Sequence, residues 1–276
     1  MTGKTDKNMK IVCVTIVFMM FILMLFPVFW IASSSFKGAS ELFSYPPTMF
    51  PKNFTLENYT KAFKAGNFGI YFMNTVFVTV TSTVITVIIN TMAGYSFAKY
   101  KFKGRDVIFV AFLCTTMIPT TLIMNPTFTV INKMGLYDSL WGIIIPPAAT
   151  PTGIFLMRQY FLSLPDSLIE SARIDGASEW SIFFRIILPL AKPVIAILTI
   201  FSFMWRWNDF IWPLLVISTP KKYTLQLAIS NFAGENNIDW SSLLAISVVS
   251  MIPVLIIFLI FQKHIINGMM TSGMKE

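Results

Sequence analysis

The chain has 276 residues, of which 55% are hydrophobic and only 12% are charged, and its formal net charge at pH 7 is +8. Soluble domains carry about 25% charged residues, so this composition excludes an ordinary soluble domain and predicts an all-α integral membrane protein. We interpret the positive charge as a signal of orientation in the membrane, and we expect no nucleic-acid partner.

Six stretches are long and apolar enough to cross a bilayer as helices, for which about 20 residues are needed. They lie near 11–32, 71–98, 107–131, 140–157, 186–217 and 243–261. Prolines interrupt several of them, at Pro119, Pro126, Pro146, Pro147, Pro151, Pro193, Pro213 and Pro253. Because neighbouring helices or water must satisfy the backbone groups that a proline frees, we expect kinked helices around a cavity.

We expect one transmembrane domain over residues 1–276 with both termini in the cytoplasm. Its predicted parts are a tail and uncleaved first span (1–32), an extracytoplasmic loop (33–70), core spans (71–261), a polar cytoplasmic segment within them (162–185) and a cytoplasmic tail (262–276). The segments assigned to the cytoplasm hold 12 Lys and Arg in 61 residues, whereas the alternate loops hold 7 in 69. Cytoplasmic loops carry an excess of these residues, which sets the predicted orientation.

The polar stretch ESARIDGASEW, residues 170–180, lies between the fourth and fifth predicted spans. Ser163 followed by Asp166 predicts a weak capping box, and Gly176 can adopt the left-handed conformation that ends a helix. Ser178 can then cap a second helix. An apolar face of the first helix is expected from residues that recur every fourth position, Leu164, Leu168 and Ala172. The pattern predicts a helical hairpin at the cytoplasmic surface, too charged to enter the membrane.

This stretch carries a resemblance to a known family. Glu170-Ser171-Ala172, then Gly176, then Ile186-Ile187-Leu188-Pro189 resembles the E-A-A, G, I-x-L-P signature of the membrane subunits of bacterial ABC importers, with serine replacing one alanine. Further segments are similar to the smaller of the two paired permease subunits in the sugar-importer branch: FTLENYTKAF (54–63), MNT (73–75), WNDFIWPL (207–214) and INGMMTSGMKE (from 266).

The resemblance implies half of the translocation pathway of an ATP-driven importer for an oligosaccharide or related polyol, working by alternating access in the bacterial cytoplasmic membrane. The implied partners are a homologous second permease subunit, two copies of a cytoplasmic ATP-binding subunit, membrane lipid, the sugar and an extracytoplasmic solute-binding protein, which the loop Ser33–Ile70 is expected to contact. No cofactor is expected on this chain, because ATP and Mg would be used by the ATPase.

The resemblance also implies that segment 162–185 is a coupling helix, which sits in a groove of the ATPase. The matching residues are Glu170, Ser171, Ala172, Arg173, Asp175 and Gly176. Glu170 and Arg173 offer charge to a polar groove, and we expect Ala172 to permit close approach. We expect Glu179, beyond the glycine, to matter less than Glu170.

No catalytic motif supports an enzyme. Gly3-Lys4-Thr5 mimics the end of a Walker A loop, but the required earlier glycine and strand are missing from the sequence. Cys13 and Cys114 are expected to be small buried hydrophobic residues rather than a disulfide or metal site.

The fifth predicted span contains candidate pathway residues. Trp205, Asn208, Asp209 and Trp212 have helical spacing on one face, where polar groups and aromatic rings would suit a carbohydrate. Alternatively, Arg206 and Asp209 neutralise each other, or they form the coupling site of a self-contained secondary transporter. Asn74 and Asn125 are also pathway candidates, with interhelical hydrogen bonding as the alternative, as for Asn90.

Overall fold

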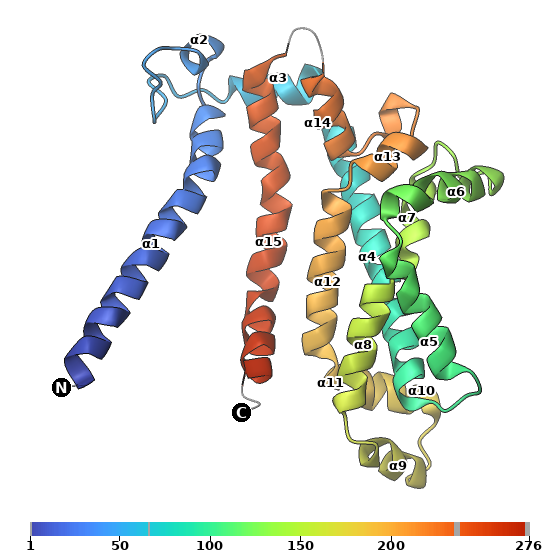
Figure 1. Ribbon diagram of the computed structural model, residues 1–276. Helices are drawn as coiled ribbons and strands as arrows, with labels where there is room; N and C mark the ends of the chain where they lie inside the picture. The colour runs from blue at the N-terminus through green and yellow to red at the C-terminus, as the bar shows by residue number, and fades with distance from the viewer. Residues whose placement is uncertain (1, 66, 235–237, 274–276) are drawn as a thin grey trace. The chain divides into compact units, whose positions relative to one another are not determined.

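The computed structural model describes residues 2–65, 67–234 and 238–273, and these residues form helices and connecting loops without a β-strand (Figure 1). They divide into two compact units, residues 1–68 with 229–252 and residues 69–228 with 253–276. Within the described chain, three helices are long and apolar enough to cross a membrane: Met9–Ser34, Phe68–Lys99 and Trp240–Lys263. Three bent helix pairs raise the number of candidate spans in the described chain to as many as six, if each pair is counted as one broken span.

The bent pairs lie where the sequence predicted proline-kinked spans. Arg105–Met117 meets Thr120–Lys133 at 109°, Leu140–Ala148 meets Pro151–Ser163 at 41°, and Glu179–Leu190 meets Lys192–Trp207 at 77°. Prolines lie at or beside each break, because a proline lacks the N–H of the helical ladder and clashes with the preceding turn. The expectation of kinks is confirmed, and the predicted spans 107–131, 140–157 and 186–217 correspond to the three bent pairs.

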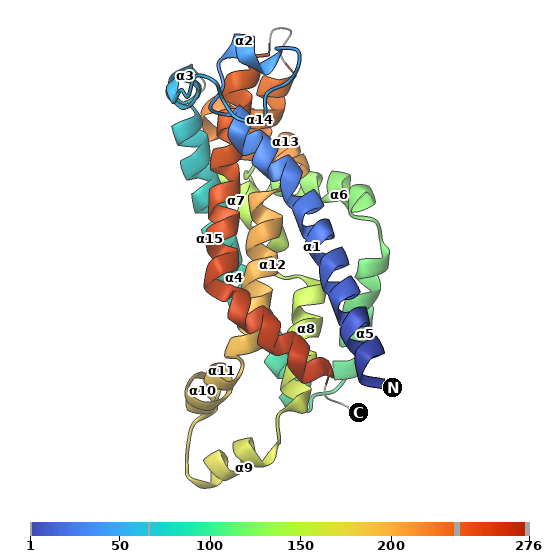
Figure 2. The ribbon, with the colours of Figure 1, turned by 90° about the vertical axis from the view of Figure 1, so that its left-hand side faces the viewer.

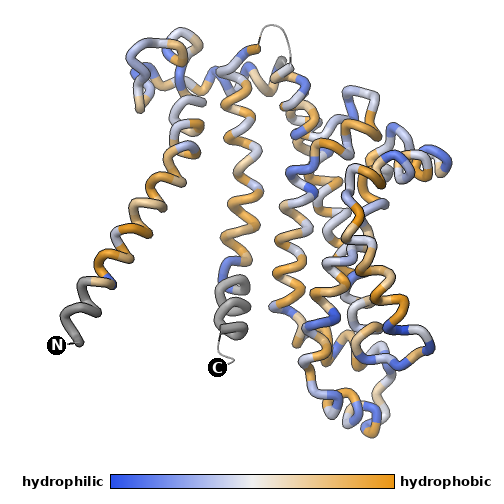
Figure 3. Tube along the Cα trace, in the orientation of Figure 1, coloured by the Kyte–Doolittle hydropathy of each residue, from blue (hydrophilic) through white to orange (hydrophobic). Residues whose placement is uncertain are grey.

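The first unit contains α1 (Thr2–Ser34), α2 (Ala39–Leu42), α3 (Glu57–Ala65) and the beginning of α15 (Trp240–Gly273). Apolar side chains of α1 from Met9 to Phe29 are exposed, and Figure 3 shows the hydrophobic colouring along this helix. The loop after α1 is held by polar bonds instead. The buried Asn58 amide donates to the carbonyls of Ser35 and Lys37, both at 2.8 Å, and the Lys37 ammonium lies 4.6 Å from the centre of the Trp30 ring.

The second unit contains most of the chain. Its helices are α4 (Phe68–Lys99), α5 (Arg105–Cys114), α6 (Thr120–Lys133), α7 (Leu140–Ile144), α8 (Pro151–Ser163), α9 (Ser167–Ile174), α10 (Glu179–Ile182), α11 (Leu188–Leu190), α12 (Lys192–Trp207), α13 (Ile211–Val216) and the start of α14 (Leu225–Ala233). A π-helical stretch, Phe183–Ile187, joins α10 to α11. Figures 1 and 2 both place α9 and α10 at the end of this unit where α8 ends.

Helix α4 contributes to two hydrophobic clusters. Near its C-terminal end, Tyr95 packs with Met157 and Phe161 of α8 and with residues of α9 to α12. Nearer its N-terminal end, Val78 packs with a cluster that includes Trp212. A Cβ on Gly94 would lie 2.5 Å from the Cβ of Met157, so glycine permits the close approach of α4 and α8. This helix therefore links the two ends of the second unit.

Candidate functional site

The polar segment 162–185 forms the predicted helix, bend and helix. Helix α9 ends before Gly176, whose φ of +78° lies in the left-handed region, and the Ser178 hydroxyl accepts a hydrogen bond from the Ser181 N–H at 3.3 Å. The capping box is wrong, because the Ser163 hydroxyl donates to the Tyr160 carbonyl at 2.7 Å. The Asp166 side chain also makes no capping bond to α9 and instead binds Lys99. Gly176 and Ser178 thus set the hairpin.

Helix α9 has one buried and one exposed face. Ala172 is buried in the first hydrophobic cluster and Leu164 packs against it, as predicted, but Leu168 is exposed and Ile169 is buried in its place. Ala172 packs within its own chain, and close approach of a partner to this residue is therefore a wrong expectation. The other predicted coupling residues are exposed: Glu170, Ser171, Arg173, Asp175 and Gly176. An apolar residue lies among them, Ile174, which is 86% exposed.

Two ion pairs hold the segment, one just before α9 and one across the bend. Lys99, the last residue of α4, donates to the Leu164 carbonyl at 2.6 Å and to an Asp166 carboxylate oxygen at 2.5 Å. After the bend, Glu179 accepts from the Arg173 guanidinium at 2.7 and 3.1 Å. The Lys99 ammonium lowers the pKa of Asp166, and the Arg173 guanidinium lowers that of Glu179. Both carboxylates are therefore ionised near neutral pH.

Tyr100 adds a contact that the sequence did not indicate. Its hydroxyl donates to the second oxygen of Glu179 at 2.6 Å, although 79 positions separate the two residues. Burial, and then the bond to Glu179, raise the pKa of the Tyr100 hydroxyl, so it remains a donor at physiological pH. Glu179, expected to matter less than Glu170, joins both halves of the hairpin to the residue that follows α4.

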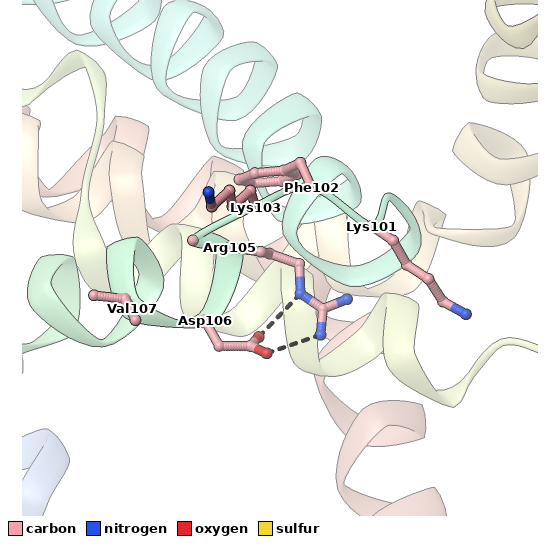
Figure 4. A pocket seen from close by; sticks show the side chains of 7 residues that line it. Lys101, Phe102, Lys103, Arg105, Asp106 and Val107 are labelled. Carbon is pink, nitrogen blue, oxygen red and sulfur yellow. Dashed lines mark hydrogen bonds and ion pairs between the residues drawn. The ribbon is translucent and has the colours of Figure 1, made fainter.

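The loop between α4 and α5 is strongly basic. Lys101, Lys103, Arg105 and Asp106 line an open hollow of about 540 Å³, and Figure 4 shows the two lysines pointing away from each other. Arg105 binds its neighbour Asp106 at 2.9 Å. Within the described residues Lys101 and Lys103 form no ion pair at 4 Å or less, and the loop presents them at the same end of α4 as the polar segment.

The proposed aromatic face of the fifth span is wrong. Helix α12 ends at Trp207, and Asn208 to Phe210 leave the helical path before α13 begins. Trp205 is 73% exposed, whereas Trp212 is buried and donates its indole N–H to the Gly142 carbonyl at 3.0 Å. The helix ends here because the Asn208 amide donates back to the Met204 carbonyl at 2.8 Å and Asp209 accepts from the Trp212 N–H at 3.3 Å. Because the helix is broken after Trp207, the spacing of Trp205, Asn208, Asp209 and Trp212 in the sequence does not place them on one helical face.

Arg206 and Asp209 do not form the predicted ion pair. Among the described residues, no nitrogen of Arg206 lies within 4 Å of an Asp209 carboxylate oxygen. Arg206 instead donates to the Ser82 hydroxyl at 3.0 Å and to the Pro147 carbonyl at 3.3 Å. The guanidinium thus holds α4 to the break between α7 and α8.

The other asparagine candidates have different surroundings. Asn74 donates to the carbonyls of Lys221 and Tyr223 at 2.9 and 3.0 Å, and the buried Asn90 exchanges hydrogen bonds with Thr150 at the start of α8. The bonding interpretation is therefore confirmed for these two. Asn125 is exposed on α6, and its amide makes no hydrogen bond within the described chain.

Other sequence expectations have mixed outcomes. Cys13 and Cys114 are exposed on helices, so burial against their own chain is wrong. In the described residues, no group of three or more His, Cys, Asp or Glu side chains could hold a metal ion. The last residues of the predicted cytoplasmic tail, 274–276, lie outside the described residues.

Comparisons with known proteins connect this arrangement to transport. Residues 90–271 match a family described as binding-protein-dependent transport system inner membrane component. The chain is 38% identical to the arabinooligosaccharides transport system permease protein AraQ of Bacillus subtilis, over 96% of this chain and 95% of that protein. It is 31% identical to the diacetylchitobiose uptake system permease protein NgcG of Streptomyces coelicolor, over 98% and 90%.

A solved structure has the same fold. The crystal structure of a bacterial ABC transporter involved in the import of the acidic polysaccharide alginate matches with a TM-score of 0.86 and 27% identity. The match covers 95% of this chain and 98% of the other.

Proposed function

The chain belongs to the family of binding-protein-dependent transport system inner membrane components and is a permease subunit of an ABC importer, and we propose that it carries an oligosaccharide or a related polyol. It is a multi-pass protein of the cytoplasmic membrane and a transport component, not a catalytic one. The similarity to permease proteins for arabinooligosaccharides and for diacetylchitobiose supports the proposed substrate class.

We propose six spans, three of them single helices and three of them bent pairs, with both termini in the cytoplasm. Within the second unit, segment 162–185 and the basic loop 99–106 lie at the same end of α4, because Lys99 binds Asp166. Lys and Arg concentrate on the cytoplasmic side of membrane proteins. This juxtaposition supports a cytoplasmic location for the segment.

The observation that carries the coupling proposal is the exposed polar face of α9. Glu170, Ser171, Arg173 and Asp175 are exposed beside Ile174, while Ile169 and Ala172 fix the opposite face to the protein. A polar groove with a small apolar pocket on an ATP-binding subunit would complement this surface. Two such subunits, which use ATP and Mg, would then drive this chain and a homologous second permease subunit between inward-open and outward-open states.

We also propose which residues face the substrate and which part of the chain contacts the solute-binding protein. Trp205, Asn208 and Asn125 are exposed in the lone chain and, with Asp209, remain candidates for the pathway shared with the second permease subunit. Asn74 and Trp212 use their donors within the chain, so we assign them to packing. The loop 33–70 would contact the solute-binding protein. A secondary transporter using Arg206 and Asp209 is disfavoured because the chain belongs to a family of ABC importer permeases.

Co-purification and uptake test the proposed function. The tagged chain, purified in mild detergent, should retain an ATP-binding subunit, and uptake should continue when an ionophore collapses the proton gradient. Uptake that stops with the gradient, without a bound ATPase, would favour the secondary transporter.

The substrate class is tested on the cognate binding protein. Arabinooligosaccharides and diacetylchitobiose should raise its melting temperature, whereas a response to amino acids alone would contradict the proposed substrate class.

A further inference from the structure

Lys99, the last residue of α4, and Tyr100, which follows it, hold the polar segment on both sides of α9. Lys99 binds Leu164 and Asp166 just before α9, and Tyr100 binds Glu179 at the start of α10. We propose that Lys99 and Tyr100 are positioning residues that make α4 and the segment move as one body. The inference rests on the proposed function, because it names the span that receives the movement of the ATPase.

The Lys99 contact is built into the protein rather than lying on its surface. The Lys99 side chain is only 5% exposed, whereas that of Asp166 is 74% exposed. A buried ammonium must keep its acceptors, and the Leu164 carbonyl at 2.6 Å supplies one that does not depend on a flexible side chain. Lys99 therefore fixes the backbone where the chain leaves α8.

The Tyr100 contact also closes the hairpin. Arg173 precedes the Gly176 bend and Glu179 follows it, so their ion pair joins α9 to α10. The second carboxylate oxygen of Glu179 accepts both from Arg173 at 3.1 Å and from Tyr100 at 2.6 Å. One carboxylate thus connects both helices of the hairpin to the end of α4.

Helix α4 reaches the opposite end of the unit. At 1.5 Å per residue its 32 residues span about 48 Å. Near its N-terminal end, Asn74 binds the backbone of residues 221 and 223, and the Thr75 hydroxyl accepts from the Leu225 N–H at 2.7 Å. A displacement of segment 166–179 would therefore reach the loop 221–225 through one continuous helix.

Spin–spin distance measurements on the purified importer test this inference. Nitroxide labels are placed at Ile174→Cys on α9 and Ile88→Cys on α4, both exposed, in a background in which Cys13 and Cys114 are serine. The distance between the labels should have a narrow distribution with the same mean before and after trapping with ATP and orthovanadate. The double variant Lys99→Met/Tyr100→Phe should retain the ATPase but widen the distribution about twofold.

Matched variants separate positioning from general damage. Lys99→Arg should behave as wild type because it keeps the charge, and Lys103→Met, in the same basic loop, should have no effect. If the double variant is not recovered from membranes, the distance distribution of Tyr100→Phe alone tests the inference. This variant removes only the hydroxyl that binds Glu179, so we expect it to fold. A wild-type distribution in the double variant, or in Tyr100→Phe if that variant decides, would overturn the inference, and so would a shift of the mean distance in the wild-type protein on trapping.

The same preparation distinguishes failure of this inference from failure of the proposed function. If Glu170→Ala retained the ATPase fully, the proposed coupling contact would be wrong. The distance distribution without nucleotide would still report whether Lys99 and Tyr100 hold the segment to α4.

Discussion

Helix α4 lies between two polar regions that use carboxylates differently. At one end, Asp138 accepts from the N–H groups of Ser218 and Thr219 at 3.0 and 2.9 Å and from the Lys222 ammonium at 2.8 Å. At the other end, Glu170 is exposed and its carboxylate makes no hydrogen bond within the described chain. The comparison teaches that a carboxylate that accepts several hydrogen bonds from its own chain stabilises its own loop. A carboxylate without such bonds, on a helix whose position is fixed, is available to a partner.

Replacing Glu170 should have the largest effect on assembly. We expect Glu170→Ala to weaken ATPase retention at least about 30-fold, because truncating one member of a buried interfacial charge pair costs about 2 to 5 kcal/mol. Glu57→Ala, which removes an exposed acid on α3, should leave retention unchanged. Quantitative pull-down of the ATPase by both variants measures this, and equal retention would reduce Glu170 to a solvated charge.

Replacing Asp138 should damage the loop but spare the ATPase contact. We expect Asp138→Ala to cost about 1 to 3 kcal/mol, because its N–H partners and Lys222 lose their acceptor. The melting temperature in detergent should fall by at least about 2 °C. Lys133→Ala, at an exposed residue nearby, is the control. Unchanged melting with Asp138→Ala would show that the loop is held by other contacts.

Replacing Gly176 tests the bend between the two hairpin helices. A side chain there meets no atom within 4 Å, so the expected cost of Gly176→Val, about 1 to 2 kcal/mol, comes from the left-handed backbone alone. ATPase retention should fall less than for Glu170→Ala. Gly38→Val is a matched control because Gly38 also has open space but an ordinary φ of −66°. Loss of retention in both variants would exclude a specific effect of the bend.

Mild acid should have the smallest effect at the Asp138 loop. Lys222 and the Thr219 hydroxyl hold the pKa of Asp138 far below its ordinary value of 3.8. A carboxyl whose pKa is lowered by folding contributes stability that is lost only as the pH falls through the folded value. Limited proteolysis of this loop should therefore be unchanged from about pH 7.5 to about pH 5. Faster cleavage at pH 5 would contradict the assignment.

The hairpin could be predicted from sequence because its determinants are local. Gly176 acts through its own backbone and Ser178 through a hydroxyl that accepts from Ser181, three residues along, so their spacing indicates the bend and the second cap. The tie from Tyr100 to Glu179 crosses 79 positions, and no local pattern encodes it. Periodicity also failed at Asn208, because counting residues assumes an unbroken helix and the side chain ends this one. The exposure of Leu168 in place of Ile169 likewise follows from packing against α8 and α4.

Site-specific photocrosslinking tests the central claim, that the exposed face of α9 contacts the ATP-binding subunit. A photoreactive amino acid is placed at Ile174, which is 86% exposed, and at Val107, which is 74% exposed on α5 near the basic loop. Irradiation of the assembled importer should attach the ATP-binding subunit to position 174 and not to position 107. No adduct at 174, or equal adducts at both positions, would contradict the account.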